Sequence, residues 1–210
     1  MVKNITSELT VSRLPLYLNY FKEAKIQGDE FASASSISMV LDIHHTQIRK
    51  DLATTGLTGK PKVGHNIDEA VEKIEEFLGW NKNRDAFLVG AGNLGSALAG
   101  YDELYMSGIN IVALFDDSPM KVGQIIHGKP VFHISEIAYT AKTLSPEIGI
   151  ITTPKDSAQA ACNLLVENGV KGIWNFSTLP VETREDVVIE NLCIDASLAV
   201  LSRKMMELTL

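Results

Sequence analysis

A glycine-rich run, Gly90-Ala91-Gly92-Asn93-Leu94-Gly95, directly follows the apolar segment 86–89 and opens a helical pattern. A lone G-x-G-x-x-G pattern is weak evidence, but a position between a buried strand and a helix is the context that a phosphate-binding turn requires. Gly90 permits the tight turn, Gly92 lets a pyrophosphate approach the backbone, and Gly95 lets the helix pack on the strand. The run predicts a nucleotide-binding turn, with a ligand-free strand-to-helix turn as the alternative.

Further apolar runs alternate with helical patterns after this turn. They cover residues 109–117, 131–134, 148–154 and 171–177, and a helix is expected over 94–107. Runs without polar alternation are typical of parallel strands that are buried on both faces. Strands that alternate with helices predict an α/β fold with a Rossmann-type, doubly wound parallel sheet.

A carboxylate stands where such a fold holds the ribose of its ligand. Asp116 ends the second strand, about 20 residues beyond Gly95,. It can accept hydrogen bonds from ribose hydroxyls and repels a 2′-phosphate, and no arginine follows at 117 or 118, which favours NAD(H),. An ordinary turn carboxylate is the alternative. The full set of candidate nucleotide contacts is Gly90, Ala91, Gly92, Asn93, Leu94, Gly95, Asp116, Asp117, Lys121, Thr152, Thr153 and Pro154.

The last three of these residues lie at the carboxyl end of the apolar run over 148–154. Ligands of doubly wound sheets bind at the carboxyl ends of the strands, which nominates this loop. Thr153-Pro154 could equally be a plain strand stop.

The N-terminal segment has a different charge and a different pattern. Residues 1–65 contain eight Lys/Arg and six Asp/Glu, whereas residues 66–210 contain eleven and twenty, so the mildly basic part can approach phosphates,. Helical spacing predicts a helix around Leu14–Lys25 with Lys25 on its apolar face, and a short helix capped by Ser33, Ser35 or Ser36 that carries Ile37, Val40 and Leu41,. A third helix is expected over 45–54.

Four features follow in an order that is typical of a winged helix-turn-helix. The third helix turns Ile48 and Leu52 inward, glycines at 56, 59 and 64 predict a small hairpin, and an amphipathic helix follows over 68–78,. A domain boundary is expected near 79–84. The last segment, 197–210, is an amphipathic helix with no place in the sheet.

The third helix carries side chains suited to DNA. Gln47 and Arg49 are residue types that read base edges, and Lys50, Lys60 and Lys62 suit phosphates,. His44 and His45 could contact phosphate or sugar, and Arg13 completes the candidate set. A solvated helix face, or a winged helix that binds protein, is the alternative.

Signals for an enzyme, an export segment or a membrane span are missing from the sequence. Tyr139 is followed four residues later by Thr143, so the Tyr-x-x-x-Lys pair of a short-chain dehydrogenase fails, and His127 and His133 read as solvated or packed,. Cys162 and Cys193 form no CxxC pair and indicate neither a disulfide framework nor a metal site,. We therefore expect no catalytic residue, no metal, no membrane partner and a cytoplasmic location.

Several motifs occur in an order that resembles one family. They are SRLPLYL at 12–18, QIRKDL at 47–52, GNLGSAL at 92–98 followed by Tyr101, FDDSPMKVG at 115–123, TTP at 152–154 and KGIWNF at 171–176. This chain resembles Rex, the redox-sensing transcriptional repressors of bacteria. The resemblance implies a homodimer that binds a palindromic, AT-rich operator, with NADH releasing the DNA and NAD⁺ competing. It also implies that the final helix is exchanged between subunits.

The resemblance implies a switch between subunits that is formed by three residues, and this chain has the family's residue at only one of the three positions. Tyr101 matches, but Asn19 stands where the family usually has arginine, and Cys193 stands where it usually has aspartate. In the wing, Thr55 and Thr58 replace aromatic residues, and the usual Lys-Arg-Gly reads Lys60-Pro61-Lys62. These departures indicate a divergent paralogue with altered operator or ligand response.

The sequence thus predicts three parts. Residues 1–80 form a winged-helix DNA-binding domain, residues 81–192 a Rossmann NAD(H)-binding domain, and residues 193–210 a swapped C-terminal helix. The expected function is a repressor that senses the NADH/NAD⁺ ratio. A small NAD-dependent oxidoreductase, a CoA- or nucleotide-binding module and a ligand-insensitive paralogue are the alternatives.

Overall fold

The structure of this protein is a computed structural model that describes residues 6–208. The chain divides into two compact units, residues 1–82 and residues 83–210, which we call unit 1 and unit 2. Among the described residues, no helix is long and apolar enough to cross a membrane.

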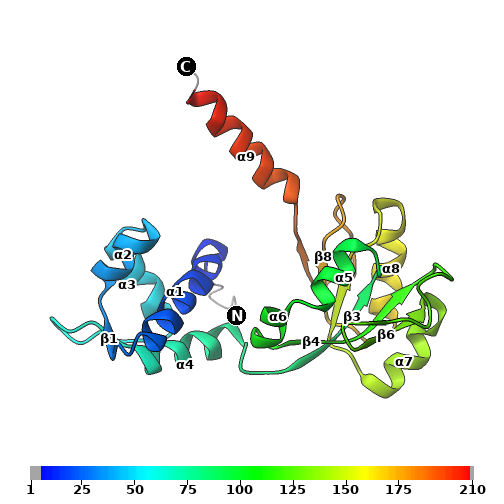
Figure 1. Cartoon of the computed structure of the whole chain (residues 1–210), viewed down its shortest axis with the longest axis horizontal. Helices are drawn as coiled ribbons and strands as arrows, with labels where there is room; N and C mark the ends of the chain where they lie inside the picture. Colours follow the sequence, from blue (N-terminus) through cyan, green and yellow to red (C-terminus); the bar gives the residue numbers. More distant parts are fainter. Residues whose placement is uncertain (1–5, 209–210) are drawn as a thin grey trace. The chain divides into compact units, whose positions relative to one another are not determined.

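Unit 1 contains four helices and one short antiparallel strand pair among its described residues (Figure 1). The elements are α1 (Glu8–Ile26), β1 (Phe31–Ala32), α2 (Ala34–Leu41), α3 (His45–Thr54), β2 (His65–Asn66) and α4 (Ile67–Leu78). The bounds of α3 confirm the helix expected over 45–54. The side chain of Ser33 accepts from the backbone N–H of Ser36, which confirms Ser33 as the N-cap of α2,.

Helical periodicity explains the core of unit 1. Leu14, Leu18 and Phe21 on α1 are fully buried against Ile48 and Leu52 of α3. Two of the expected inward positions are wrong, because Lys25 is exposed and pairs with Asp68 at 2.6 Å, and Val40 is 68% exposed. The eight-residue helix α2 has room to bury little more than Ala34 and Ile37. Helix α1 also begins at Glu8, one and a half turns before the expected start,.

The segment between α3 and α4 contains a tight turn with a single bridge and not the expected two-stranded hairpin, since its strand β2 pairs with β1 from before α2. Strands β1 and β2 pair antiparallel, with Ala32 opposite His65, and the turn beyond them is closed by Lys60 and Gly64. The N–H of Lys60 donates to the carbonyl of Gly64 at 2.7 Å, and the N–H of Gly64 donates back at 3.0 Å. Lys62 has a φ of 63°, in the left-handed region that favours glycine,. The resembled family usually has a glycine at this position.

Unit 2 is built on a seven-stranded sheet with the order β5-β6-β4-β3-β7-β8-β9. All neighbours pair in parallel except β5 and β6, and the strand order reverses between β3 and β7. This is the doubly wound Rossmann arrangement that the sequence predicted. The strands are β3 (Arg84–Val89), β4 (Ile109–Asp116), β5 (Ile125–Ile126), β6 (Lys129–His133), β7 (Ile148–Ile151), β8 (Gly172–Asn175) and β9 (Val188–Asn191).

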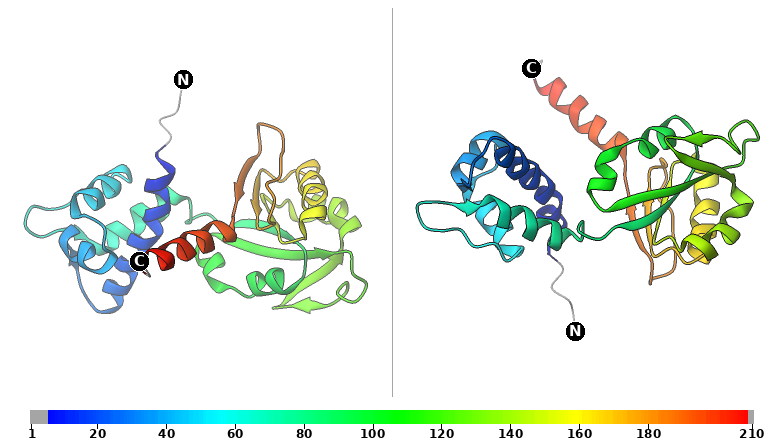
Figure 2. Two further views of the ribbon diagram at one scale, coloured as in Figure 1. Left: turned by 90° about the horizontal axis from the view of Figure 1, so that it is seen from above. Right: turned by 60° about the horizontal axis from the view of Figure 1, so that its bottom comes forward.

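Alternate residues of the strands supply two separate cores. Phe87 and Val89 of β3 face α7 (Ile137–Leu144) and α8 (Lys155–Glu167), where Leu165 is fully buried. Ala86 and Leu88 face the opposite side, towards α5 (Asn93–Ala99) and α6 (Asp102–Met106). The two cores cover the two faces of the sheet (Figures 1 and 2). The parallel pairing of the strands places their carboxyl ends on the same side of the sheet.

Two expectations for unit 2 are wrong in detail. The helix expected over 94–107 is divided at Gly100, where Lys129 donates to the carbonyl of Ala99 at 2.9 Å and the His127 ring lies where a Cβ atom of residue 100 would be. Strand β9 was not predicted, because its sequence, VIEN, carries two polar residues and lies at the sheet edge with mostly exposed side chains.

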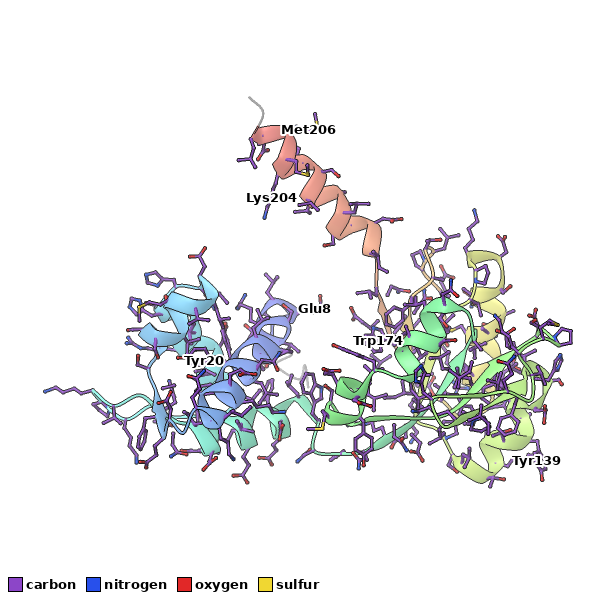
Figure 3. All side chains as sticks on the ribbon, in the orientation of Figure 1. Glu8, Tyr20, Tyr139, Trp174, Lys204 and Met206 are labelled. Atoms are coloured by element: carbon purple, nitrogen blue, oxygen red, sulfur yellow. The ribbon has the colours of Figure 1, made fainter. Side chains whose placement is uncertain are left out.

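The last helix, α9 (Ile194–Glu207), follows β9 directly. It begins three residues before the expected Ser197, and residues 209 and 210 of the expected helix lie outside the described residues. Every described side chain of α9 is exposed, and those of Lys204 and Met206 are labelled in Figure 3. Its apolar residues recur on one stripe, namely Ile194, Leu198, Leu201, Met205 and the following Leu208.

The central strands should carry most of the stability of unit 2. We expect Phe87→Ala to lower the free energy of unfolding by about 3–5 kcal/mol, because it empties a fully buried site between Phe115 and α8,. Urea unfolding followed by Trp174 fluorescence in a Trp80→Phe background measures this. Tyr139→Ala is the control, since Tyr139 is 78% exposed (Figure 3), and a cost above about 1 kcal/mol there would contradict the packing,.

Candidate nucleotide-binding site and DNA-binding surface

The glycine-rich turn lies where the strand order of unit 2 reverses. Gly90 follows β3 with a φ of 104°, which a side chain would strain, and its carbonyl accepts from the hydroxyl of Thr152 at 2.7 Å. A Cβ atom on Gly95 would lie 1.9 Å from that same carbonyl oxygen. The first and third glycines are therefore required by the protein itself, because they let α5 and β7 close on the turn.

Gly92 is different, because the protein does not require it. A Cβ atom at this position would meet nothing within 4 Å, and its φ of -74° suits any residue. The position is nevertheless the N-cap of α5, where backbone N–H groups and the helix dipole favour an anion,. The open space beside Gly92 fits the close approach of a pyrophosphate to the backbone.

The carboxylate of Asp116 lies beside this turn and is 8% exposed. One oxygen accepts from the N–H of Ala91 at 2.7 Å and from Lys121 Nζ at 3.1 Å, and the other accepts from the N–H of Ser118 at 2.9 Å. Burial raises the pKa of Asp116, but the hydrogen bonds from Ser118, Lys121 and Ala91 together lower it below its usual value. Asp116 is therefore an ionised acceptor at neutral pH.

A pocket of about 830 Å³ connects these groups, a volume in the range of ligand-binding sites,. Gly90, Gly92, Asp116, Asp117 and Lys121 line it from one side. Thr152, Thr153 and Pro154 line it from the end of β7, and Ile134, Ala160, Ala161 and Leu164 add an apolar wall. The sequence reasoning missed this wall, because small and branched residues of α8 look like ordinary core positions.

One buried hydroxyl at the pocket lacks a hydrogen-bond partner among the described residues. The hydroxyl oxygen of Thr153 is buried and makes no hydrogen bond among the described residues. Such an atom costs free energy unless a ligand group satisfies it. With the space beside Gly92 and the ionised Asp116, it makes the pocket a good fit for a dinucleotide with unmodified ribose. Four of the predicted contacts, namely Ala91, Asn93, Leu94 and Gly95, do not line the pocket and belong to the turn and the start of α5.

The predicted DNA contacts of unit 1 fall into two groups. Arg49, Lys60 and Lys62 line one groove of about 550 Å³ together with Ser33 and Ser35. Lys50 is exposed on α3 as well, so four cations lie on the exposed surface of α3 and the wing turn. Lys60 also lies over the ring of Phe31, 5.0 Å from its centroid. A cationic groove beside a helix is suited to the phosphates of a duplex.

The other predicted contacts are engaged within the protein. The imidazole of His44 accepts from the N–H of Thr46 as the N-cap of α3, and its ring lies 4.4 Å from that of His45. Arg13 and Gln47 both donate to the carboxylate of Asp51. Asp51 was missed in the sequence, although a charged residue between Ile48 and Leu52 on an inward helix face is the signal that marks it.

The three candidate switch residues are exposed or at helix ends. Tyr101 is 53% exposed and is the N-cap of α6 in unit 2. Cys193 is an exposed free cysteine and the N-cap of α9. Asn19 is exposed on α1 in unit 1. The described residues also contain no group of three metal-ligating side chains.

Comparison with known families matches both units. Residues 6–53 match the family described as "Putative DNA-binding protein N-terminus", and residues 81–179 match the "CoA binding domain". The chain is 40% identical to the redox-sensing transcriptional repressor Rex of Treponema denticola over 91% of each chain. It is 38% identical to the Rex repressor of Caldicellulosiruptor saccharolyticus, covering 98% of this chain and 93% of that relative.

Solved structures match the whole architecture. The crystal structure of RSP in complex with β-NAD⁺ and operator DNA matches with a TM-score of 0.90 and 32% identity, over 98% of this chain and 94% of that one. RSP in complex with β-NADH matches with a TM-score of 0.87 and 31% identity, over 98% and 96%. RSP is described as a Rex-family repressor.

The glycines of the turn give a matched pair of tests. We expect Gly92→Ala to leave the free energy of unfolding within about 0.5 kcal/mol of the original, because its Cβ meets nothing in the protein,. It should weaken NADH binding by about 10- to 100-fold, because the added methyl occupies the space of the pyrophosphate. Isothermal calorimetry and thermal unfolding measure the two effects.

The companion variant is Gly95→Ala, whose Cβ would collide with the carbonyl of Gly90. Here the unfolding temperature should fall together with NADH affinity. NADH binding by Gly92→Ala with unchanged affinity would show that the pyrophosphate does not lie at this turn.

Proposed function

This chain belongs to the Rex family of redox-sensing transcriptional repressors, and we propose that it binds operator DNA through unit 1 and releases that DNA when NADH binds in unit 2. The observation that carries the proposal is a single chain with both sites. A cationic groove lies beside α3 and the wing turn, and a dinucleotide-sized pocket surrounds Asp116. We assign DNA binding to residues 1–80, NAD(H) binding to 81–192 and subunit contact to 193–210.

The ligand of unit 2 is NAD(H). The related RSP has been solved with β-NAD⁺ and with β-NADH. CoA and NADP carry an additional phosphate on the ribose, and the buried carboxylate of Asp116 disfavours a phosphate at this position,. Lys121 is the nearest cation, but Asp116 already neutralises it through the 3.1 Å ion pair. Gly90, Gly92 and the loop Thr152–Pro154 would hold the pyrophosphate side of the ligand, and Asp117 would line its rim.

The chain acts as a regulator and not as an enzyme, because its relatives are repressors. The pocket residues accordingly serve to bind. The pyrophosphate fits the N-terminus of α5, the ribose hydroxyls fit Asp116, and the hydroxyl of Thr153 gains a partner. Binding energy of this kind shifts a regulator between two arrangements only by the difference in affinity for them.

DNA recognition rests on α3 and the wing. Lys50, Lys60 and Lys62 contact phosphates of a palindromic, AT-rich operator, and Gln47 and Arg49 reach base edges,. His44 and His45 lie at the helix end that approaches the backbone. Arg13 contributes indirectly, since its guanidinium already binds Asp51 at 2.6 Å. The relatives come from bacteria, whose DNA lies in the cytoplasm, so we propose the same location for this chain.

A homodimer follows from the palindrome and from α9. Two copies of a DNA-binding unit match a two-fold operator. The apolar stripe of α9 is exposed over its described length, and we propose a second subunit as the partner that covers it. Tyr101, Asn19 and Cys193 would lie at or near the contacts between subunits, with uncharged groups at 19 and 193.

The repressor proposal is tested with a duplex selected from randomised DNA by the wild-type protein. We expect tight, salt-sensitive binding, with saturating NADH lowering the affinity by about 5- to 150-fold. Asp116→Ala should bind NADH about 10- to 150-fold more weakly, because hydrogen bonds to a charged group are lost. It should therefore keep its DNA affinity and require correspondingly more NADH for release, as read by fluorescence anisotropy.

Two results would separate the alternatives. Selective DNA binding that saturating NADH leaves unchanged would identify a ligand-insensitive paralogue, which the uncharged Asn19 and Cys193 favour as the second candidate. Turnover of NADH with carbonyl substrates, without selective DNA binding, would overturn the repressor proposal.

The dimer proposal is tested on α9. We expect Leu201→Asp to shift the protein from dimer to monomer in sedimentation equilibrium, because it places a charge in the centre of the apolar stripe,. Ala199→Asp introduces the same side chain on the opposite side of the helix and serves as the control,. A Leu201→Asp protein that remains dimeric at low micromolar concentration would show that α9 is not the main subunit contact.

A further inference from the structure

The carboxylate of Asp51 is the most completely hydrogen-bonded side chain of unit 1. Asp51 lies on α3, is 1% exposed, and accepts five hydrogen bonds from four side chains. Arg13 donates twice, from Nε at 2.6 Å and from Nη2 at 2.9 Å. Tyr17 donates at 2.8 Å and Thr10 at 3.1 Å, so three donors belong to α1. The fourth donor, Gln47, belongs to α3 itself.

This arrangement fixes the carboxylate in place. A carboxylate has about four lone-pair sites. The five N–H and O–H groups from these four side chains occupy both oxygens of Asp51. The bidentate contact with Arg13 sets the plane of the group and balances its charge,. Burial raises the pKa of Asp51, but the hydrogen bonds from Arg13, Gln47 and Tyr17 hold it below its usual value, so the group is ionised at neutral pH.

Gln47 connects Asp51 to the proposed DNA-binding surface, because it bonds to Asp51 and is itself a predicted DNA contact. It lies one turn before Asp51 in the first turn of the helix, and its Nε2 donates to Asp51 Oδ1 at 2.8 Å. Its side chain is half-buried, whereas its neighbours Arg49 and Lys50 are exposed and free to adopt many rotamers. A long side chain that is held before binding loses less conformational entropy when the DNA arrives.

The contact also determines which end of the amide is held. An ionised carboxylate can only accept, so the NH₂ group of Gln47 must face Asp51 and the amide oxygen must face away,. The amide oxygen and the second N–H then remain for a base edge. This acceptor and donor pair matches the N6 and N7 positions of adenine in the major groove.

We propose that Asp51 is a positioning residue for operator recognition: it holds Gln47 with its amide oxygen outward and so sets the preference of α3 for adenine at the base pair that Gln47 faces. Arg13, Tyr17 and Thr10 hold Asp51 in turn. The proposal rests on DNA binding through α3, and it assigns to the buried network a part in sequence selection beyond its part in stability.

The test is a double-mutant cycle in the full-length protein, with Asp51→Asn, Gln47→Ala and the double variant. The probes are the selected duplex, the same duplex with the Gln47-facing A·T pair changed to G·C, and a random duplex of equal length, at one salt concentration. We expect Asp51→Asn to lower the preference for A·T over G·C by about 10-fold, because the amide is no longer oriented. In the Gln47→Ala background the same change should have no effect on that preference.

A merely structural role predicts a different pattern. If Asp51→Asn weakens binding to all three duplexes by the same factor, or lowers the preference equally with and without Gln47, the proposal is overturned. Failure of the wild-type protein to distinguish the selected duplex from the random one would instead refute DNA recognition by this chain. NADH affinity, measured on each variant, should stay constant because the pocket belongs to unit 2.

A second measurement covers the case in which Asp51→Asn fails to fold. The side-chain NH₂ signals of Gln47 in the wild-type protein can be assigned from their absence in Gln47→Ala. We expect one proton to be shifted downfield and protected from exchange, as for a donor to a buried carboxylate,. Two signals at the ordinary positions of an exposed glutamine, both exchanging rapidly with water, would show that Gln47 is not held, and would overturn the proposal without any variant of Asp51.

Discussion

The close approach of three backbone segments at the end of β3 is the constraint on which unit 2 depends. The carbonyl of Gly90 lies so near Gly95 that no side chain fits between them, and the same carbonyl accepts from Thr152 at the end of β7. These contacts join β3, the following helix α5 and the neighbouring strand β7, between which the strand order reverses. They create the edge at which Asp116 and Thr153 face one pocket. The position of the pocket therefore follows from the packing of this turn against α5 and β7.

Two buried carboxylates show how the same group serves two purposes in this chain. Asp51 accepts five hydrogen bonds from side chains and has no remaining capacity, so it can only hold other residues,. Asp116 accepts three, and the oxygen that faces Ser118 has only that one donor. The remaining lone pairs of Asp116 can accept ribose hydroxyls. The proposed ligand role of Asp116 thus rests on its unfilled acceptor sites, which Asp51 lacks.

The sequence alone predicted those features that depend on neighbours along the chain. The turn at Gly90–Gly95 and the ends of α3 follow from local glycine placement and helical spacing, and both are confirmed. The break between α5 and α6 could not be predicted, because the residues that contact it, Lys129 and His127, belong to a distant hairpin. For the same reason, the sequence could not show which side chains donate to Asp51, or that the hydroxyl of Thr153, a predicted contact, has no partner among the described residues. Their roles depend on donors from α1, or on a missing donor, and these become apparent only once the chain is folded.

The residues at 19 and 193 restrict how the two functions can be linked. An amide and a thiol can form at most a neutral hydrogen bond, which contributes roughly 0.5–1.5 kcal/mol, less than hydrogen bonds to charged groups. A shift in operator affinity of about 100-fold requires about 2.7 kcal/mol. A neutral hydrogen bond between these two groups would therefore be too weak to supply that free energy alone. Exposed apolar surface is a second source, because burying it stabilises whichever arrangement covers it. The stripe of α9 is such a surface, since Ile194, Leu198 and Leu201 are all more than half exposed. We therefore propose that apolar contacts of α9 contribute to the signal that an ion pair is implied to carry in the relatives.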